Sequence, residues 1–192
     1  MSANQPDIAG FQRAVASRLH EHWKLYLVEG IVLIVLGVLA ILIPPIATLT
    51  FTLVLGWVFL ISGVVGLFTT FWMRKAPGFW WSLISALLGI IVGATLLAQP
   101  VSGALSLTVV LAAFFLIEGA SSIMFALEHK RELTGRWGWM LASGVVDLLL
   151  ATMILAGLPS TAAWAIGLLV GINMVFGGTA LIGMALQARK AA

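Results

Sequence analysis

Residues 47–71 read ATLTFTLVLGWVFLISGVVGLFTTF, a run that contains no charged side chain and no proline. About 20 consecutive, mainly apolar residues suffice for a helix to cross the hydrocarbon core of a bilayer. Threonine and serine are the only strongly polar residues in this run. We therefore expect residues 47–71 to form a transmembrane helix.

The composition of the whole chain agrees with this stretch. Of its 192 residues, 61% are hydrophobic and only 9% are charged, whereas a soluble domain has about 25% charged residues. Because no cysteine is present, disulfides, thiolate metal sites and cysteine nucleophiles are excluded. We predict an all-α integral membrane protein with six transmembrane helices, approximately at 25–43, 47–71, 79–98, 102–127, 138–157 and 161–186.

The positive charges predict the orientation in the membrane. All Lys and Arg residues lie at the chain ends or in two of the links, as Arg13, Arg18, Lys24, Arg74, Lys75, Lys130, Arg131, Arg136, Arg189 and Lys190. The other three links, at 44–45, 99–102 and 158–160, contain proline and no charge. Basic residues beside a span stay in the cytoplasm. We expect a multi-pass protein of a bacterial inner membrane with both termini in the cytoplasm.

Residues 1–22 form an N-terminal cytoplasmic segment in this interpretation. Ile8, Phe11, Val15 and Leu19 recur at helical spacing, which indicates an amphipathic helix. This helix would lie on the membrane surface or pack beneath the spans, and the sequence leaves both open. No basic region, apolar core and cleavage site precede the first span, so we expect no cleaved signal peptide.

The chain contains an internal threefold repeat. Prolines follow the first span of each repeat at Pro44, Pro100 and Pro159, separated by 56 and 59 residues. In the second spans, LGWVFLISG at 55–63 aligns with LAAFFLIEG at 111–119 and VGINMVFGG at 170–178. Each repeat has two spans, so all three enter the membrane in the same direction and are parallel repeats. We predict three helical hairpins with pseudo-threefold symmetry, at 23–73, 79–128 and 137–187, followed by a cytoplasmic tail at 188–192.

Small residues recur at fixed places in these spans. They allow helix backbones to approach closely where lipid provides no hydrophobic driving force. Packing within one subunit and a contact between subunits both fit this pattern. The predicted packing residues are Gly56, Gly63, Gly89, Gly93, Gly119, Gly167, Gly171 and Gly178.

The pattern of glycine, apolar stretch, proline and returning glycine helix resembles the HdeD family of acid-resistance membrane proteins. Its elements here are Gly30, Gly37, Pro44, Gly56, Gly63, Gly93, Pro100, Gly119, Gly144, Pro159, Gly171 and Gly178, within residues 23–187. The resemblance implies six spans and a role in survival under acid stress. It transfers no catalytic residue.

Three carboxylates lie inside predicted spans: Glu29, Glu118 and Asp147. Charged groups in the membrane are costly and are candidate functional residues. At a rise of 1.5 Å per residue, Glu118 and Asp147 lie about 15–18 Å from the inner boundary, near the midplane. All three carboxylates are candidate buried proton-titrating residues, since desolvation disfavours the ionised form. The other interpretation is a pair of neutral acids that hydrogen-bond between helices.

Motifs of enzymes are missing from the sequence. It contains no phosphate-binding glycine loop, no metal-binding helix motif and no serine elbow. We expect no catalytic residue, no metal, no cofactor and no nucleic-acid partner. The functions considered are an HdeD-like role in acid resistance, a small proton-conducting or transport protein, and a subunit of a larger membrane complex. Lipid is the expected surrounding, with a second copy or another membrane protein as possible partner.

Overall fold

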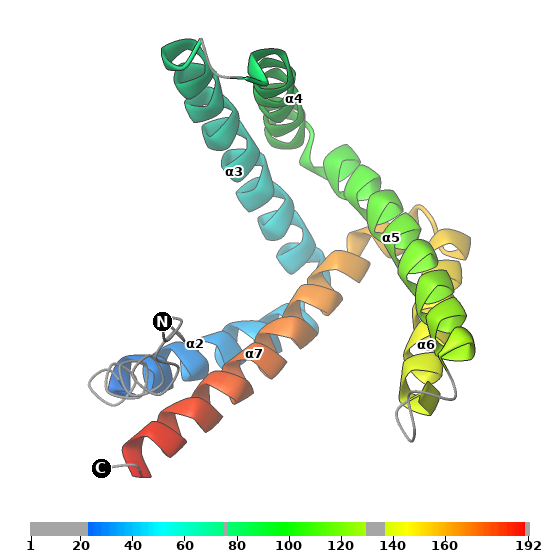
Figure 1. The fold of residues 1–192 in the computed structure, drawn as a ribbon. Coiled ribbons are helices and arrows are strands. Elements are labelled where there is room, and N and C mark those ends of the chain that lie inside the picture. Colours follow the sequence, from blue (N-terminus) through cyan, green and yellow to red (C-terminus); the bar gives the residue numbers. More distant parts are fainter. Residues whose placement is uncertain (1–22, 75–76, 130–136, 191–192) are drawn as a thin grey trace, which may run out of the picture. The chain divides into compact units, whose positions relative to one another are not determined.

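The computed structural model describes residues 23–74, 77–129 and 137–190. The described residues are helical, apart from short turns (Figure 1). The predicted amphipathic segment at 1–22 lies outside the described residues, as do Lys75, Lys130, Arg131 and Arg136. The elements are α2 (Trp23–Leu42), α3 (Pro44–Trp72), α4 (Phe79–Ala98), α5 (Pro100–Glu128), α6 (Trp137–Ala156), the 3-10 helix η1 (Ser160–Ala163) and α7 (Ala165–Lys190).

Six of these helices are long and apolar enough to cross a membrane. Their bounds agree with the predicted spans to within a few residues, so the chain is a multi-pass membrane protein. The buried share of each span inside the protein is only 17–28%. The apolar remainder therefore faces the lipid bilayer.

Short and long helices alternate along the chain. Helices α2, α4 and α6 have 20 residues each, whereas α3 and α5 have 29 and α7 has 26. Twenty residues span about 30 Å, which matches the hydrocarbon core of a bilayer. The long helices α3 and α5 begin at Pro44 and Pro100 themselves. Proline is favoured in the first turn because its missing N–H would have no helical partner there.

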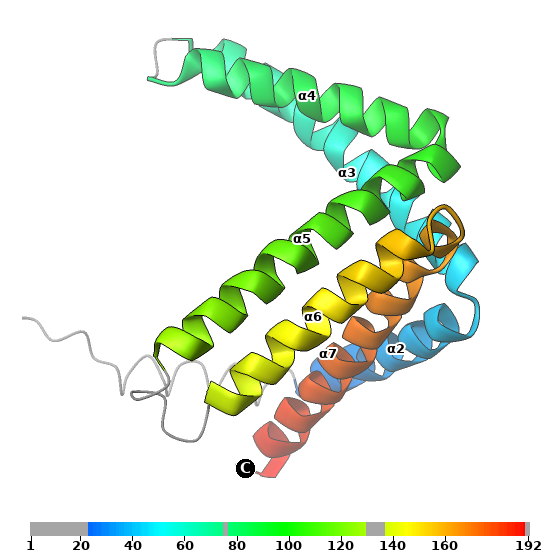
Figure 2. The ribbon, with the colours of Figure 1, turned by 90° about the vertical axis from the view of Figure 1, so that its right-hand side faces the viewer.

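The described chain forms two compact units, with α2 and most of α7 in the first and residues 44–168 in the second. In the first unit α2 and α7 run antiparallel, since Gly30 meets Gly178 while Gly37 meets Gly171. In the second unit α3 packs against α4 and α5 packs against α6 along their lengths (Figures 1 and 2).

The packed pairs differ from the hairpins predicted by sequence. Helices α4 and α5, which form the predicted hairpin 79–128, meet mainly near their turn, where Leu96 contacts Gly103. The extensive contacts cross the charged links instead, between α3 and α4 and between α5 and α6. The physical reason is that the small residues of each second helix face those of the following first helix. The packed pair and the sequence repeat are thus offset by one helix.

Candidate functional site: small-residue contacts and adjacent carboxylates

Each helix pair is held by two small residues per helix, seven positions apart. All twelve residues are buried. They are Gly30 and Gly37 with Gly178 and Gly171 in α2/α7, Gly56 and Gly63 with Gly93 and Ala86 in α3/α4, and Gly119 with Gly144 in α5/α6, where Ala112 and Ala151 occupy the equivalent repeat positions.

The backbones at these positions are too close for a larger residue. A Cβ atom added at Gly119 would lie 2.7 Å from the carbonyl oxygen of Gly144, and one at Gly144 would lie 2.8 Å from that of Gly119. At Gly93 an added Cβ would lie 2.5 Å from the amide nitrogen of Leu60. The close approach gives van der Waals contact over the helix backbones, which is the main source of helix association in lipid.

Most of the glycines predicted from sequence lie in these contacts, and two do not. Gly89 is looser, because an added Cβ would lie 3.3 Å from the nearest atom, the carbonyl oxygen of Phe59. Gly167 lies against Pro44 and Thr48 at the start of α3, and not against a small residue of a paired helix. Its N–H donates to Oγ1 of Thr48 at 2.9 Å. Three alanines join the predicted glycines at these positions: Ala112 and Ala151, which the repeat aligns with packing glycines, and Ala86, which was not singled out from the sequence.

The three proline turns come together at one end of the second unit. A cavity of about 250 Å³ is bordered there by Pro45, Thr48, Val101, Ser102, Pro159 and Ala162, among others. Four buried threonines surround this end, and none has an unsatisfied side chain. Thr52 donates to the carbonyl of Thr48, Thr108 to that of Ala104 and Thr161 to that of Ile154, at 2.7–2.8 Å.

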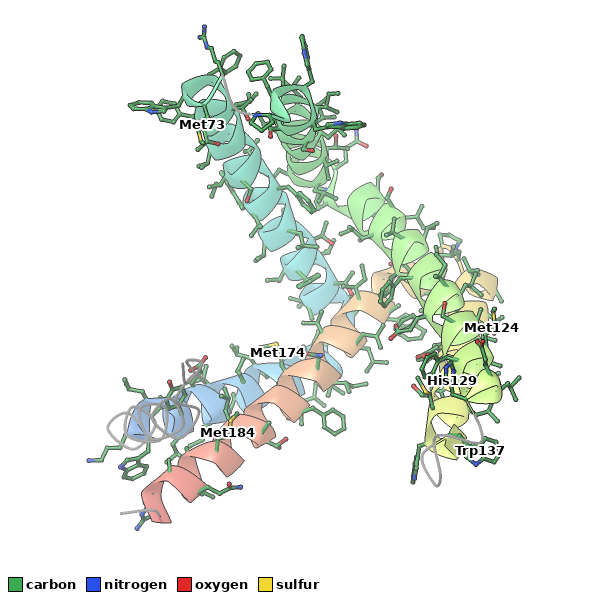
Figure 3. All side chains as sticks on the ribbon, in the orientation of Figure 1. Met73, Met124, His129, Trp137, Met174 and Met184 are labelled. Carbon is green, nitrogen blue, oxygen red and sulfur yellow. The ribbon has the colours of Figure 1, made fainter. Side chains whose placement is uncertain are left out.

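In each of the two units, the helix ends away from the proline links carry aromatic and basic side chains. Trp23, at the start of α2, lies beneath Lys24 and beneath Arg189 of α7, with distances of 5.7 and 5.5 Å from the cationic groups to the ring centroid. His129 stacks on Phe125 at 4.1 Å and lies at the same end of α5/α6 as Trp137 (Figure 3). Such belts are typical of the membrane–water interface.

The structure places all three carboxylates beside small-residue contacts. Glu29 precedes Gly30 on α2 and Glu118 precedes Gly119 on α5, and both residues are exposed to the protein's surroundings. Asp147, three residues after Gly144 on α6, is half-buried. Within the described part of the chain, none of the three carboxylate side chains makes a hydrogen bond or an ion pair.

Glu118 and Asp147 lie on the same side of the α5/α6 pair. Successive residues of an α-helix are rotated by about 100°, so Glu118 lies about 100° before Gly119, while Asp147 lies about 60° short of a full turn after Gly144. Helices α5 and α6 are antiparallel and face each other through Gly119 and Gly144. The rotation from Gly119 to Glu118 and the rotation from Gly144 to Asp147 therefore place both carboxylates on the same side of the helix pair. Glu29 belongs to the other compact unit.

Among the described residues, no group of three potential metal ligands occurs. The arrangement offers two carboxyl groups on a helix pair inside the membrane, and hydroxyl groups at the corresponding places of α3/α4. Its chemistry is that of hydrogen bonding within a bilayer.

Comparison with known proteins places this architecture in a family. A family model described as "Short repeat of unknown function (DUF308)" matches twice, at residues 28–98 and 87–156. The protein HdeD of Escherichia coli K12 is 25% identical over 173 residues, which cover 87% of this chain and 88% of that protein. The HdeD proteins of Escherichia coli O157:H7 and Shigella flexneri match equally well. No solved structure matches significantly. The chain therefore belongs to the DUF308 repeat family and is an HdeD-family membrane protein.

Proposed function

We propose that this protein supports survival under acid stress as an HdeD-like component of a bacterial inner membrane. The observation that carries the proposal is the similarity to HdeD along 87% of the chain, together with the six helices long and apolar enough to span a membrane. The similarity to HdeD also supports a role in the bilayer that does not involve catalysis.

The proposed orientation puts both termini in the cytoplasm and the proline turns outside. It rests on the position of all ten basic residues away from those turns. The chain has no cysteine, so single cysteines report orientation directly. Ser102→Cys in a proline turn should react with a membrane-impermeant thiol reagent in intact spheroplasts. Arg74→Cys should react only after the membrane is permeabilised, and the reverse pattern would refute the orientation.

The experiment for the function is survival of a deletion strain after acid challenge. We expect wild-type protein to restore survival. The Glu118→Gln, Asp147→Asn double variant, at matched membrane levels, separates two roles for the carboxyl groups. Rescue by this variant assigns them to hydrogen bonding, and failure assigns the function to their titration. If the deletion has no effect on survival, the proposed role is wrong for this protein.

A further inference from the structure

One side of the α3/α4 pair is a groove lined by hydroxyl groups. It measures about 550 Å³ and is bordered by Ser62, Gly66 and Thr69 of α3 and by Ser82, Ser85 and Gly89 of α4, among others. Thr69 donates to the carbonyl of Gly66 at 3.0 Å. The side chains of the three serines make no hydrogen bond within the described residues, so their hydroxyl donors are free for a partner.

The corresponding side of the α5/α6 pair carries carboxylates. The two pairs pack through equivalent repeat positions, since an added Cβ at Gly63 would lie 2.8 Å from the carbonyl oxygen of Ala86, as at Gly119 and Gly144. The repeat places Glu118 where α3 has Ser62. It also places Ser143 and Asp147 where α4 has Ser85 and Gly89. We call Glu118, Ser143 and Asp147 the acidic side of α5/α6.

Within the second unit, neither surface is covered. Ser62, Ser85, Glu118 and Ser143 are exposed and Asp147 is half-buried. A carboxyl group facing lipid costs several kcal/mol, so residues of this kind almost always face protein or a water-filled cavity. The acidic side of α5/α6 is therefore expected to face a protein partner or a water-filled cavity.

We propose that the partner is a second copy of this chain, with the acidic side of one copy seated in the α3/α4 groove of the next. All copies enter the membrane in the same direction, so rotation about the membrane normal keeps each residue at its depth. Equivalent repeat positions place Ser62 and Ser85 at the depth of Glu118 and Ser143. Free hydroxyl donors then meet carboxyl acceptors, and Gly66 and Gly89 let the backbones approach.

The proposed contact is heterologous, because each copy binds one neighbour through the acidic side of α5/α6 and another through its α3/α4 groove. Contacts of this type close into rings when the rotation permits. Both surfaces of this interface lie on the second compact unit of the chain. The proposed assembly goes beyond the role in acid stress and does not depend on it.

Paired cysteines in the cysteine-free chain test the contact. Two differently tagged copies, one with Ser85→Cys and one with Ser143→Cys, are co-expressed and treated in membranes with a short thiol cross-linker. The matched controls are Leu87→Cys and Val145→Cys, which lie on the opposite side of the same small residues and are 45% and 44% exposed. We expect the serine positions to give several-fold more cross-linked dimer than the controls.

Two outcomes of the cross-linking would overturn the proposal. One is equal or no dimer at both sets of positions. The other is a cross-link within a single chain when both serine positions are replaced together and no dimer forms, because the surfaces would then meet inside one molecule.

The mass of the complex in nanodiscs provides an independent test. Glu118→Leu with Asp147→Leu should reduce the complex to monomers, whereas Glu118→Gln with Asp147→Asn should keep it, since amides still hydrogen-bond. A second variant covers the case in which the leucine variant fails to fold. Ser62→Ala with Ser85→Ala, which keeps side chains that helices tolerate, should also give monomers. A ring of unchanged mass with the serine variant contradicts the proposal.

Discussion

At the scale of single residues, alanine substitutions at two adjacent glycines in α7 distinguish the effect of helix packing from the effect of helix propensity. A Cβ added at Gly178 would lie 2.6 Å from the carbonyl oxygen of Gly30, whereas nothing lies within 4 Å of one added at Gly177. We expect Gly178→Ala to lower the free energy of unfolding by about 1–3 kcal/mol, the usual cost of overpacking. Gly177→Ala should have no destabilising effect. Thermal unfolding in detergent measures both, and equal effects would argue against the α2/α7 contact.

The hydroxyl of Thr48 is a second residue with a defined partner. It accepts the N–H of Gly167 at 2.9 Å, in the first turn of α7, where no helical carbonyl is available to that N–H. Thr48→Val should therefore cost about 1–3 kcal/mol, because a buried donor is left unsatisfied. Thr48→Ser should retain most of the stability. The control is Thr95→Val, because Thr95 is exposed and its hydroxyl donates to a carbonyl of its own helix. A loss of stability at Thr95 as large as at Thr48 would contradict the assigned role of the Thr48 hydroxyl.

Sequence reasoning at this scale identified residues but not their partners. The glycines at 56, 63, 119, 171 and 178 stood out because they recur between repeats. Ala112 and Ala151, which are fully buried at 0% exposure, stand at equivalent repeat positions but were not among the predicted packing residues. A glycine in a span reports close packing, but the residue opposite is determined by the rotation of two helices, which one sequence does not contain.

At the scale of elements, the aromatic ring of Trp23 connects the two ends of the described chain. Arg189 of α7 lies over this ring of α2 at 5.5 Å. A cation–π contact at an exposed site is worth about 0.5–1 kcal/mol, so Arg189→Gln should destabilise the α2/α7 pair by that amount and Arg189→Lys by less. Arg74 lies 5.3 Å from the ring centroid of Phe71, next to it in the same chain segment. Arg74→Gln is therefore the control, because it removes a cation–π contact that does not join two helices. Hydrogen exchange of the last turn of α7 measures the difference, and equal exchange in both variants would contradict it.

Helix positions could be predicted well from sequence, while helix pairing could not. Proline at 44 and 100 and apolar runs of suitable length determine where α3 and α5 begin. Adjacent spans with a tight turn between them suggested hairpins, because short connections usually join packed neighbours. The α4–α5 turn is a single residue, Gln99, yet α4 packs along α3. The small residues outweigh the turn, since close backbone contact is available only across the charged link.

At the scale of the whole molecule, three antiparallel pairs each join a second helix of one repeat to a first helix of another repeat. The pairs are α3/α4, α5/α6 and α2/α7, and the last joins the first and last helices of the chain. All three use the same repeat positions for their close contacts. A duplicated sequence can therefore build three similar contacts, and in the second repeat, where α4 and α5 belong to one unit, these contacts are made with α3 and α6.

The central claim is that helices pack across the charged links, and a disulfide within one chain tests it most directly. An added Cβ at Gly66 would lie 3.3 Å from the Cβ of Ala86, and no other atom would lie closer than 3.9 Å. A disulfide needs Cβ atoms about 3.5–4.5 Å apart, so Gly66→Cys with Ala86→Cys should oxidise readily to an intramolecular bond in membranes. Ala86→Cys with Ala113→Cys, which would be opposite each other in a packed α4–α5 hairpin, should not. A disulfide in the second variant and none in the first would contradict the account.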